Sequence, residues 1–425
     1  MRTDRSDLQN LFSVLTSVGV LQGVSLGTGF ATLAVIGKTL GASELGDFAF
    51  ITSAVFLFSN LAALGFGQAA LSRYARLSRF TWGQRAIKHQ MKSTLYVTVF
   101  MSALSCFLIG AILMATDATP TLFWGAVAWS FVCPLLVFTG DQARALGHIR
   151  LGAILSTGGV NISPIVSSLA LAAVLFLPQV QFTAAELAIW TLPVAGTLTL
   201  LMFSPKVFGN PVTLLRLKSR YSPRSLFLKS LPFAATRLTP VYQSGDVVIV
   251  GLVASPELTG LYSAAARLAA IVSFPLTLLV KTATPTIASL WASHSLTRLR
   301  SYIFRILLIS AVATFMIAIP LLASPEQMLN LLFGPSLTAA APYLLVLTTG
   351  RLISGCCGPT GGVITAIGEG KPLARSIIYT ATLALSIGTV ASMTHGAIGV
   401  AWVFAIALVF QNTYQLSHLF PKLTR

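Results

Sequence analysis

Five charged side chains interrupt long apolar stretches in the second half of the sequence: Arg237, Asp246, Arg267, Lys281 and Arg351. A charge at the centre of a bilayer costs at least about 2.5–3.5 kcal/mol, so it usually faces a partner or a watery cavity. Four of the five are cations, which leaves an excess of three positive charges. Phosphate is the obvious ligand for such a set, because a guanidinium group matches its oxygens bidentately.

Asp246 and Arg267 lie on either side of a turn expected near residue 254. At about 1.5 Å per residue, and once the residues of the turn are subtracted, we place both at similar depths, about 12 Å from the turn, so they could form an ion pair between two helices. The pair could hold the helices together, or Asp246 could take part in ion coupling. Arg237 is near a helix end, where it could reach lipid headgroups instead.

Lys281 lies between Pro275 and Pro285, which are expected to interrupt their helix and to expose backbone groups to a cavity. Arg351 falls near the middle of its apolar stretch, too deep to reach the surface. A water-filled cavity that receives an anion explains both cations best. We therefore predict four substrate-binding residues, Arg237, Lys281, Arg351 and Arg267.

Motifs of enzyme or cofactor chemistry are missing from the sequence. No P-loop pattern occurs, so we expect no nucleotide site. The histidines map to loops or helix ends, and the cysteines lie in apolar runs without metal-ligand company, so the latter are interpreted as packing residues. We therefore expect no catalytic residues, no cofactor and no metal. The histidines are His89, His148, His294, His395 and His418, and the cysteines are Cys106, Cys133, Cys356 and Cys357.

The composition requires a membrane. Of the 425 residues, 55% are hydrophobic and only 9% are charged, whereas soluble domains carry about 25% charged residues. Many apolar runs reach the roughly 20 residues that cross a bilayer, and because they do not alternate with polar residues they favour helices. We predict twelve spans, at 11–37, 47–69, 94–115, 120–139, 152–176, 184–204, 231–253, 259–290, 302–323, 338–366, 376–393 and 396–416.

The distribution of charge agrees with twelve spans and cytoplasmic termini. Of the 28 Lys and Arg residues, four fall within spans, Lys38 lies at the outer side, and the remaining 23 lie in inner loops or at inner helix ends. This bias is the positive-inside rule, so the net charge of +17 requires no nucleic-acid partner. The predicted spans of the first half hold no carboxylate in the hydrocarbon interior.

Two short segments near half-length spacing suggest an internal repeat. Ala42–Ala49 and Ser255–Ala264 each carry Glu-Leu followed by a glycine at the start of an even-numbered span. Six spans per half would make the halves parallel repeats. We predict an N-terminal six-helix lobe over residues 1–215 and a C-terminal six-helix lobe over 216–425.

Three groups of short motifs resemble the polysaccharide-transporter branch of the MOP exporter superfamily, the Wzx-type O-antigen flippases. Their order and the twelve-helix count carry the resemblance over nearly the full chain. The motifs are Gly41–Phe50 with Leu64–Ala69; Asp246–Gly251 followed by Gly260–Leu268; and Leu332–Pro335 with Ala340–Pro342 and Ala366–Gly368.

The resemblance implies an all-α, MATE-like fold with two parallel six-helix lobes around a central cavity of alternating access. It also implies a flippase of the cell inner membrane that moves an undecaprenyl-pyrophosphate-linked oligosaccharide, an O-antigen or exopolysaccharide repeat unit. The partners would be this lipid-linked substrate, membrane lipids, and a polysaccharide polymerase with its assembly proteins.

Three alternatives remain open at this level. A multidrug exporter of the same superfamily would need membrane carboxylates, and only Asp246 is available. A non-transporting scaffold would leave the buried cations without a task. A membrane enzyme would need large outer loops, and those predicted here are short.

Overall fold

The computed structural model is helical throughout the part of the chain that it describes, with no strand there. The prediction of an all-helical protein is therefore confirmed. The described residues are 5–63, 65–67, 69–70, 74, 83–115, 119–155, 164–176, 184–209, 238–293 and 295–424.

Nine helical stretches among these residues are long and apolar enough to cross a membrane. They cover ten of the twelve predicted spans, because α18 (Gly370–Thr424) merges the last two across a kink at Gly396. The other two predicted spans, 152–176 and 231–253, run partly outside the described residues. Their described parts are the ends α6 (Ile149–Leu155) and α7 (Pro164–Phe176) of the first and α11 (Leu238–Val253) of the second. The chain is a multi-pass membrane protein.

The helices fall into two compact units. The N-terminal unit comprises Met1–Ile36 and Ile51–Ser244, and the C-terminal unit comprises Gly37–Phe50 and Gly245–Arg425. The turn between α1 (Arg5–Leu40) and α2 (Ala42–Ala62) thus belongs to the C-terminal unit. The lobe boundary predicted at 215/216 lies outside the described residues and stays a prediction.

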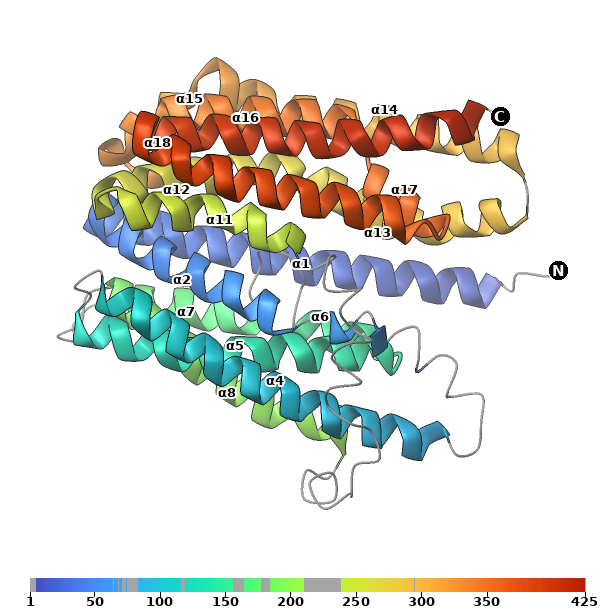
Figure 1. Ribbon diagram of the computed structural model, residues 1–425, viewed down its shortest axis with the longest axis horizontal. Helices are drawn as coiled ribbons and strands as arrows, with labels where there is room; N and C mark the ends of the chain where they lie inside the picture. The colour runs from blue at the N-terminus through green and yellow to red at the C-terminus, as the bar shows by residue number, and fades with distance from the viewer. Residues whose placement is uncertain are drawn as a thin grey trace. The chain divides into compact units, whose positions relative to one another are not determined.

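In the N-terminal unit, α5 (Pro120–Ala145) packs against α4 (Gly83–Met114), α6 and α8 (Ala184–Phe208) (Figure 1). The Thr119 hydroxyl caps α5 by accepting a hydrogen bond from the Leu122 amide, and a proline follows, as is usual at a helix start.

The same helix continues past the predicted end at residue 139. Asp141, predicted in an inner loop, is therefore a buried helical residue, with the Arg144 Nη1 3.4 Å from its Oδ1. The described N-terminal unit thus contains one buried carboxyl group near a helix end, which the predicted span boundaries missed.

In the C-terminal unit, α16 packs against α12, α14 and α18, and α13 packs against α14 and α17 (Figure 1). The predicted outer loop 324–337 is itself mostly helical, because it contains α15 and the start of η3. The bounds are α12 Pro256–Ala270, η2 Ile271–Ser273, α13 Phe274–Ala292, α14 Leu296–Ala323, α15 Pro325–Phe333, η3 Pro335–Ala340, α16 Ala341–Cys356 and α17 Thr360–Ala366.

Within this unit the two similar segments found in the sequence contact one another. A Cβ atom on Gly46 of α2 would overlap the carbonyl of Pro256, and one on Gly260 of α12 would overlap the carbonyl of Ala42. Each carbonyl precedes the glycine of its own helix by four residues, so the contact is symmetric. Small residues permit such close backbone approach between membrane helices.

Two predicted spans are broken rather than continuous. The span 259–290 is interrupted by the 3-10 turn η2, which ends two residues before Pro275, whereas α13 continues through Pro285, which was wrongly expected to interrupt it. The span 338–366 is interrupted between α16 and α17, where Gly358 adopts a φ of 71° that favours glycine.

Side chains of α18 bridge the second break. The Asn412 Nδ2 donates to the Ser354 Oγ (2.7 Å), and the Thr360 hydroxyl lies 3.3 Å from the Asn412 Oδ1 and 2.9 Å from the Gln415 Oε1. The Gln415 Nε2 donates in turn to the Ser376 Oγ at 2.9 Å. The network holds α16 and α17 against α18 on both sides of the break.

Candidate functional site

The buried carboxyl group of Asp246 is the centre of the candidate site. Asp246 is on α11, is 4% exposed, and its Oδ2 accepts a hydrogen bond from the Tyr262 hydroxyl at 3.2 Å. Its Oδ1 lies 2.8 Å from the Val247 amide nitrogen, which donates to it. Tyr262 is on α12 and fully buried, with its ring centroid 5.8 Å from that of Tyr343. The carboxyl group is therefore held by fixed neighbours.

Two guanidinium groups act on this carboxyl group. Arg267, near the end of α12, and Arg351, on α16, both interact electrostatically with Asp246. The Arg351 Nη1 also donates to the Ser273 Oγ at 3.3 Å, and Ser273 belongs to the 3-10 turn η2. Residues from α11, α12, η2 and α16 thus form one charged cluster inside the C-terminal unit.

The packing of small residues brings these helices together. Gly260 allows α12 to approach α2, as described above. Gly350, directly before Arg351, allows α16 to approach α18, because a Cβ there would lie 2.8 Å from the Cα of Ala405. A larger residue at either position would displace a helix that carries one of the arginines.

The charge of the cluster is positive in either protonation state of Asp246. With an ionised carboxyl group the two guanidinium groups leave a charge of +1, and with a neutral one they leave +2. Guanidinium groups are well suited to phosphate oxygens, because their donors form a rigid fork. The arrangement can bind an anion by charge and hydrogen bonding, whereas it would repel a cation.

The structure brings together three of the five charged residues singled out in the sequence: Asp246, Arg267 and Arg351. Arg237 lies outside the described residues. Lys281 lies in α13, where only its backbone is described. The roles predicted for these two side chains stay predictions.

Tyr262 and Ser273 are members of the cluster that the analysis of charges did not select. Tyr262 follows the turn at 254 by as many residues as Asp246 precedes it, so equal depth puts the two opposite each other. Arg267 is five residues farther along its helix, about 7 Å deeper. The prediction that Asp246 and Arg267 lie at similar depths was therefore wrong, because α12 already begins at Pro256 and the turn is shorter than expected. A search of the facing helix for polar as well as charged residues would have found Tyr262.

Metal binding has no candidate group in the described part of the chain, where no three His, Cys, Asp or Glu side chains lie close enough together. The described cysteines are all free thiols.

Comparison with known proteins gives a family and a fold. The sequence model of the family described as polysaccharide biosynthesis protein matches residues 8–291. No curated protein matches the sequence.

Several solved structures share the fold. An inward-facing MATE family multidrug resistance transporter of the MOP superfamily is 14% identical, with a TM-score of 0.70 over 97% of this chain and 98% of the other. The lipid II flippase MurJ, in an inward closed conformation, is 12% identical, with a TM-score of 0.69 over 95% of this chain and 87% of the other. A MOP superfamily transporter from Pyrococcus furiosus, described as having a binding pocket of reverse polarity, is 12% identical, with a TM-score of 0.65 over 97% and 95%. The expected MATE-like fold is thereby confirmed.

Proposed function

Because the chain belongs to the polysaccharide biosynthesis protein family, we propose that it is a flippase for an undecaprenyl-pyrophosphate-linked oligosaccharide. It has the fold of MOP superfamily transporters. The cargo is an O-antigen or exopolysaccharide repeat unit that crosses the inner membrane by alternating access. The protein moves this cargo without altering it chemically.

The single observation that carries the proposal is the positive cluster around Asp246. The pyrophosphate of such a cargo is an anion that must leave water to cross the bilayer, so it needs cationic partners inside the protein. Arg267 and Arg351 supply them, and Lys281 and Arg237 extend the binding region. One of the solved structures of this fold is that of a lipid II flippase, which supports a flippase over other transporters.

In this proposal, Asp246 stabilises the two arginines when no cargo is bound. Its carboxyl group offsets part of the charge of Arg267 and Arg351 when no cargo is bound, and the cargo phosphate then competes with it for the same guanidinium groups. Such competition would link cargo binding to a rearrangement of α11 against α12 and α16.

The membrane location and the partners of the protein are part of the same proposal. The protein is placed in the cell inner membrane with both termini in the cytoplasm, in contact with membrane lipids. A polysaccharide polymerase and assembly proteins act on the cargo after it has crossed.

A complementation assay tests the proposal. A bacterium without its own O-antigen or exopolysaccharide flippase receives wild type, Arg351→Gln, or Arg298→Gln, which removes an exposed arginine outside the cluster. We expect wild type and Arg298→Gln to restore surface polysaccharide and Arg351→Gln to fail at equal protein level.

Restoration by Arg351→Gln as strong as by wild type would remove the cluster from the mechanism. Drug resistance without restoration of polysaccharide, in several hosts that express the protein, would favour a multidrug exporter instead.

A further inference from the structure

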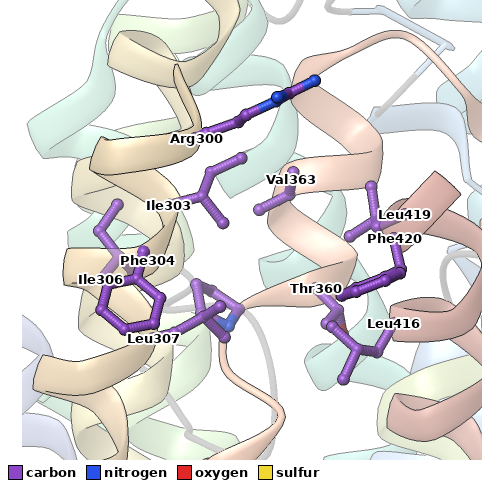
Figure 2. A pocket seen from close by; sticks show the side chains of 11 residues that line it. Arg300, Ile303, Phe304, Ile306, Leu307, Thr360, Val363, Leu416, Leu419 and Phe420 are labelled. Carbon is purple, nitrogen blue, oxygen red and sulfur yellow. The ribbon is translucent and has the colours of Figure 1, made fainter. Parts of the chain in front are cut away.

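A separate pocket opens on the C-terminal unit between α14, α17 and α18 (Figure 2). Its volume is about 250 Å³. The side chains around it are hydrocarbon except for Arg300 and Thr360, and Phe304 and Phe420 on its rim are 68% and 65% exposed. No step of the proposed transport uses this pocket.

The pocket runs inward from one membrane interface. Arg300 lies one turn inside the start of α14, at the beginning of a span that covers Thr297–Ala323, and Leu307 lies about 10 Å deeper along the same helix. Figure 2 shows the Arg300 side chain extending across one end of the pocket towards α17. The guanidinium group of Arg300 therefore lies at one end of an apolar pocket, at the level of lipid headgroups.

The inner wall of the pocket is part of the hydrophobic core. Ile303, Val363 and Leu419 belong to the buried core of this part of the unit. Thr360 is already bonded to the side chains of Asn412 and Gln415. The wall thus offers no unbonded polar group to a sugar, whereas a hydrocarbon chain would make only apolar contacts with it.

We propose that this pocket binds one acyl chain of an anionic phospholipid, with Arg300 paired to the lipid phosphate. The acyl chain lies along Phe304, Leu307 and Phe420 and contacts Pro359 and Thr360, next to the break between α16 and α17. Under the predicted topology this interface is the cytoplasmic one, whose leaflet carries anionic lipids. A bound lipid would stabilise the packing of α17 against α14 and α18.

The observations favour a phospholipid over the carrier lipid of the cargo. The pocket has one cation and no free polar group for a saccharide. The inference does not depend on the proposed function, because its test measures lipid binding and not export.

Lipid titration of the delipidated full-length protein in detergent tests the proposal, read by native mass spectrometry and by thermal unfolding. We expect phosphatidylglycerol to bind wild type about fivefold more tightly than phosphatidylcholine, the effect of one interfacial cation. Arg300→Gln should lose this preference. Arg298→Gln removes an exposed arginine of α14 that does not line the pocket, and it should keep the preference.

Filling the pocket gives a second test. Leu416→Trp, from α18, should weaken binding of both lipids, while unfolding without lipid checks that the variant is folded. Equal binding of the two lipids by wild type, or an equal loss in Arg298→Gln, would overturn the proposal. So would displacement of phosphatidylglycerol by equimolar undecaprenyl phosphate, which would assign the pocket to the cargo.

Discussion

At the scale of single residues, the hydrogen bond between Tyr262 and Asp246 ties α12 to α11. Both residues are buried, so water cannot replace the phenol as a donor when the hydroxyl is removed. The strength of this bond sets how firmly the carboxyl group is fixed beside Arg267 and Arg351.

Tyr262→Phe should therefore destabilise the protein. Hydrogen bonds between membrane helices contribute about 0.6 to 1.7 kcal/mol, and we expect a loss in that range, measured as a lower temperature of unfolding in detergent. Tyr343→Phe is the control. The ring of Tyr343 packs on Tyr262, but its hydroxyl makes no hydrogen bond to any of the described residues. Equal destabilisation by both variants would mean that ring packing, and not the hydrogen bond, is what matters.

The charged residues of the site stand out in the sequence by themselves, whereas its polar members stand out only once the facing helix positions are considered. A buried charge stands out in an apolar run because its cost is large, which is how Asp246, Arg267 and Arg351 were found. Tyr262 and Ser273 are common in apolar helices, and only the pairing of α11 with α12 and the turn η2 gives them a role.

At the scale of elements, close backbone contact fixes how α2 and α12 cross. No space for a methyl group remains on the side of Gly46 that faces α12 or on the side of Gly260 that faces α2. The obstructing atoms are backbone carbonyls, which cannot rotate away. Because α12 carries both Tyr262 and Arg267, its displacement would move the candidate site.

Gly260→Ala should cost about 1–3 kcal/mol of stability, the typical cost of overpacking, and should lower the yield of folded protein in size-exclusion chromatography. Gly370→Ala changes a glycine with open space around it and should have little effect. If Gly260→Ala behaves like this control, the contact between α2 and α12 is looser than described.

The break between α16 and α17 depends on Asn412, which bonds to Ser354 before the break and to Thr360 after it. Asn412→Leu should reduce stability by about 1–2 kcal/mol in thermal unfolding, because two buried hydroxyl groups lose a partner. Thr389→Leu, an exposed change on the first half of α18, is the matched control. An unchanged unfolding temperature for Asn412→Leu would show that the network is dispensable.

The sequence predicts where the helices occur, but not where they are interrupted or how far they extend. Mean apolar character predicts that 338–366 is within the membrane, and it is insensitive to a local turn. Gly358-Pro359 is the signal for the break, because glycine permits a positive φ and proline removes a backbone donor. At α5, continuation past the apolar run depended on packing of Asp141 and Gln142, which hydropathy cannot detect.

At the scale of the whole molecule, the distribution of Lys and Arg predicts the orientation of the chain in the membrane. Cysteine labelling measures that orientation in a variant in which the four native cysteines are replaced by alanine. A cysteine at Glu326, which is exposed, should react with an impermeant maleimide in intact cells. One at Lys371, also exposed, should react only after permeabilisation. The opposite pattern would invert the topology.

The central claim is that the cationic cluster carries the phosphate of a lipid-linked cargo across the bilayer. The most direct measurement is flipping of a fluorescent undecaprenyl-pyrophosphate-linked oligosaccharide in vesicles reconstituted with purified protein, followed by an impermeant quencher. Wild type and Arg298→Gln should exchange the cargo between leaflets. Arg351→Gln should be slower by about tenfold or more, the effect of losing one charge-assisted hydrogen bond to the phosphate. Equal rates for Arg351→Gln and wild type, or no exchange by folded wild type, would contradict the account.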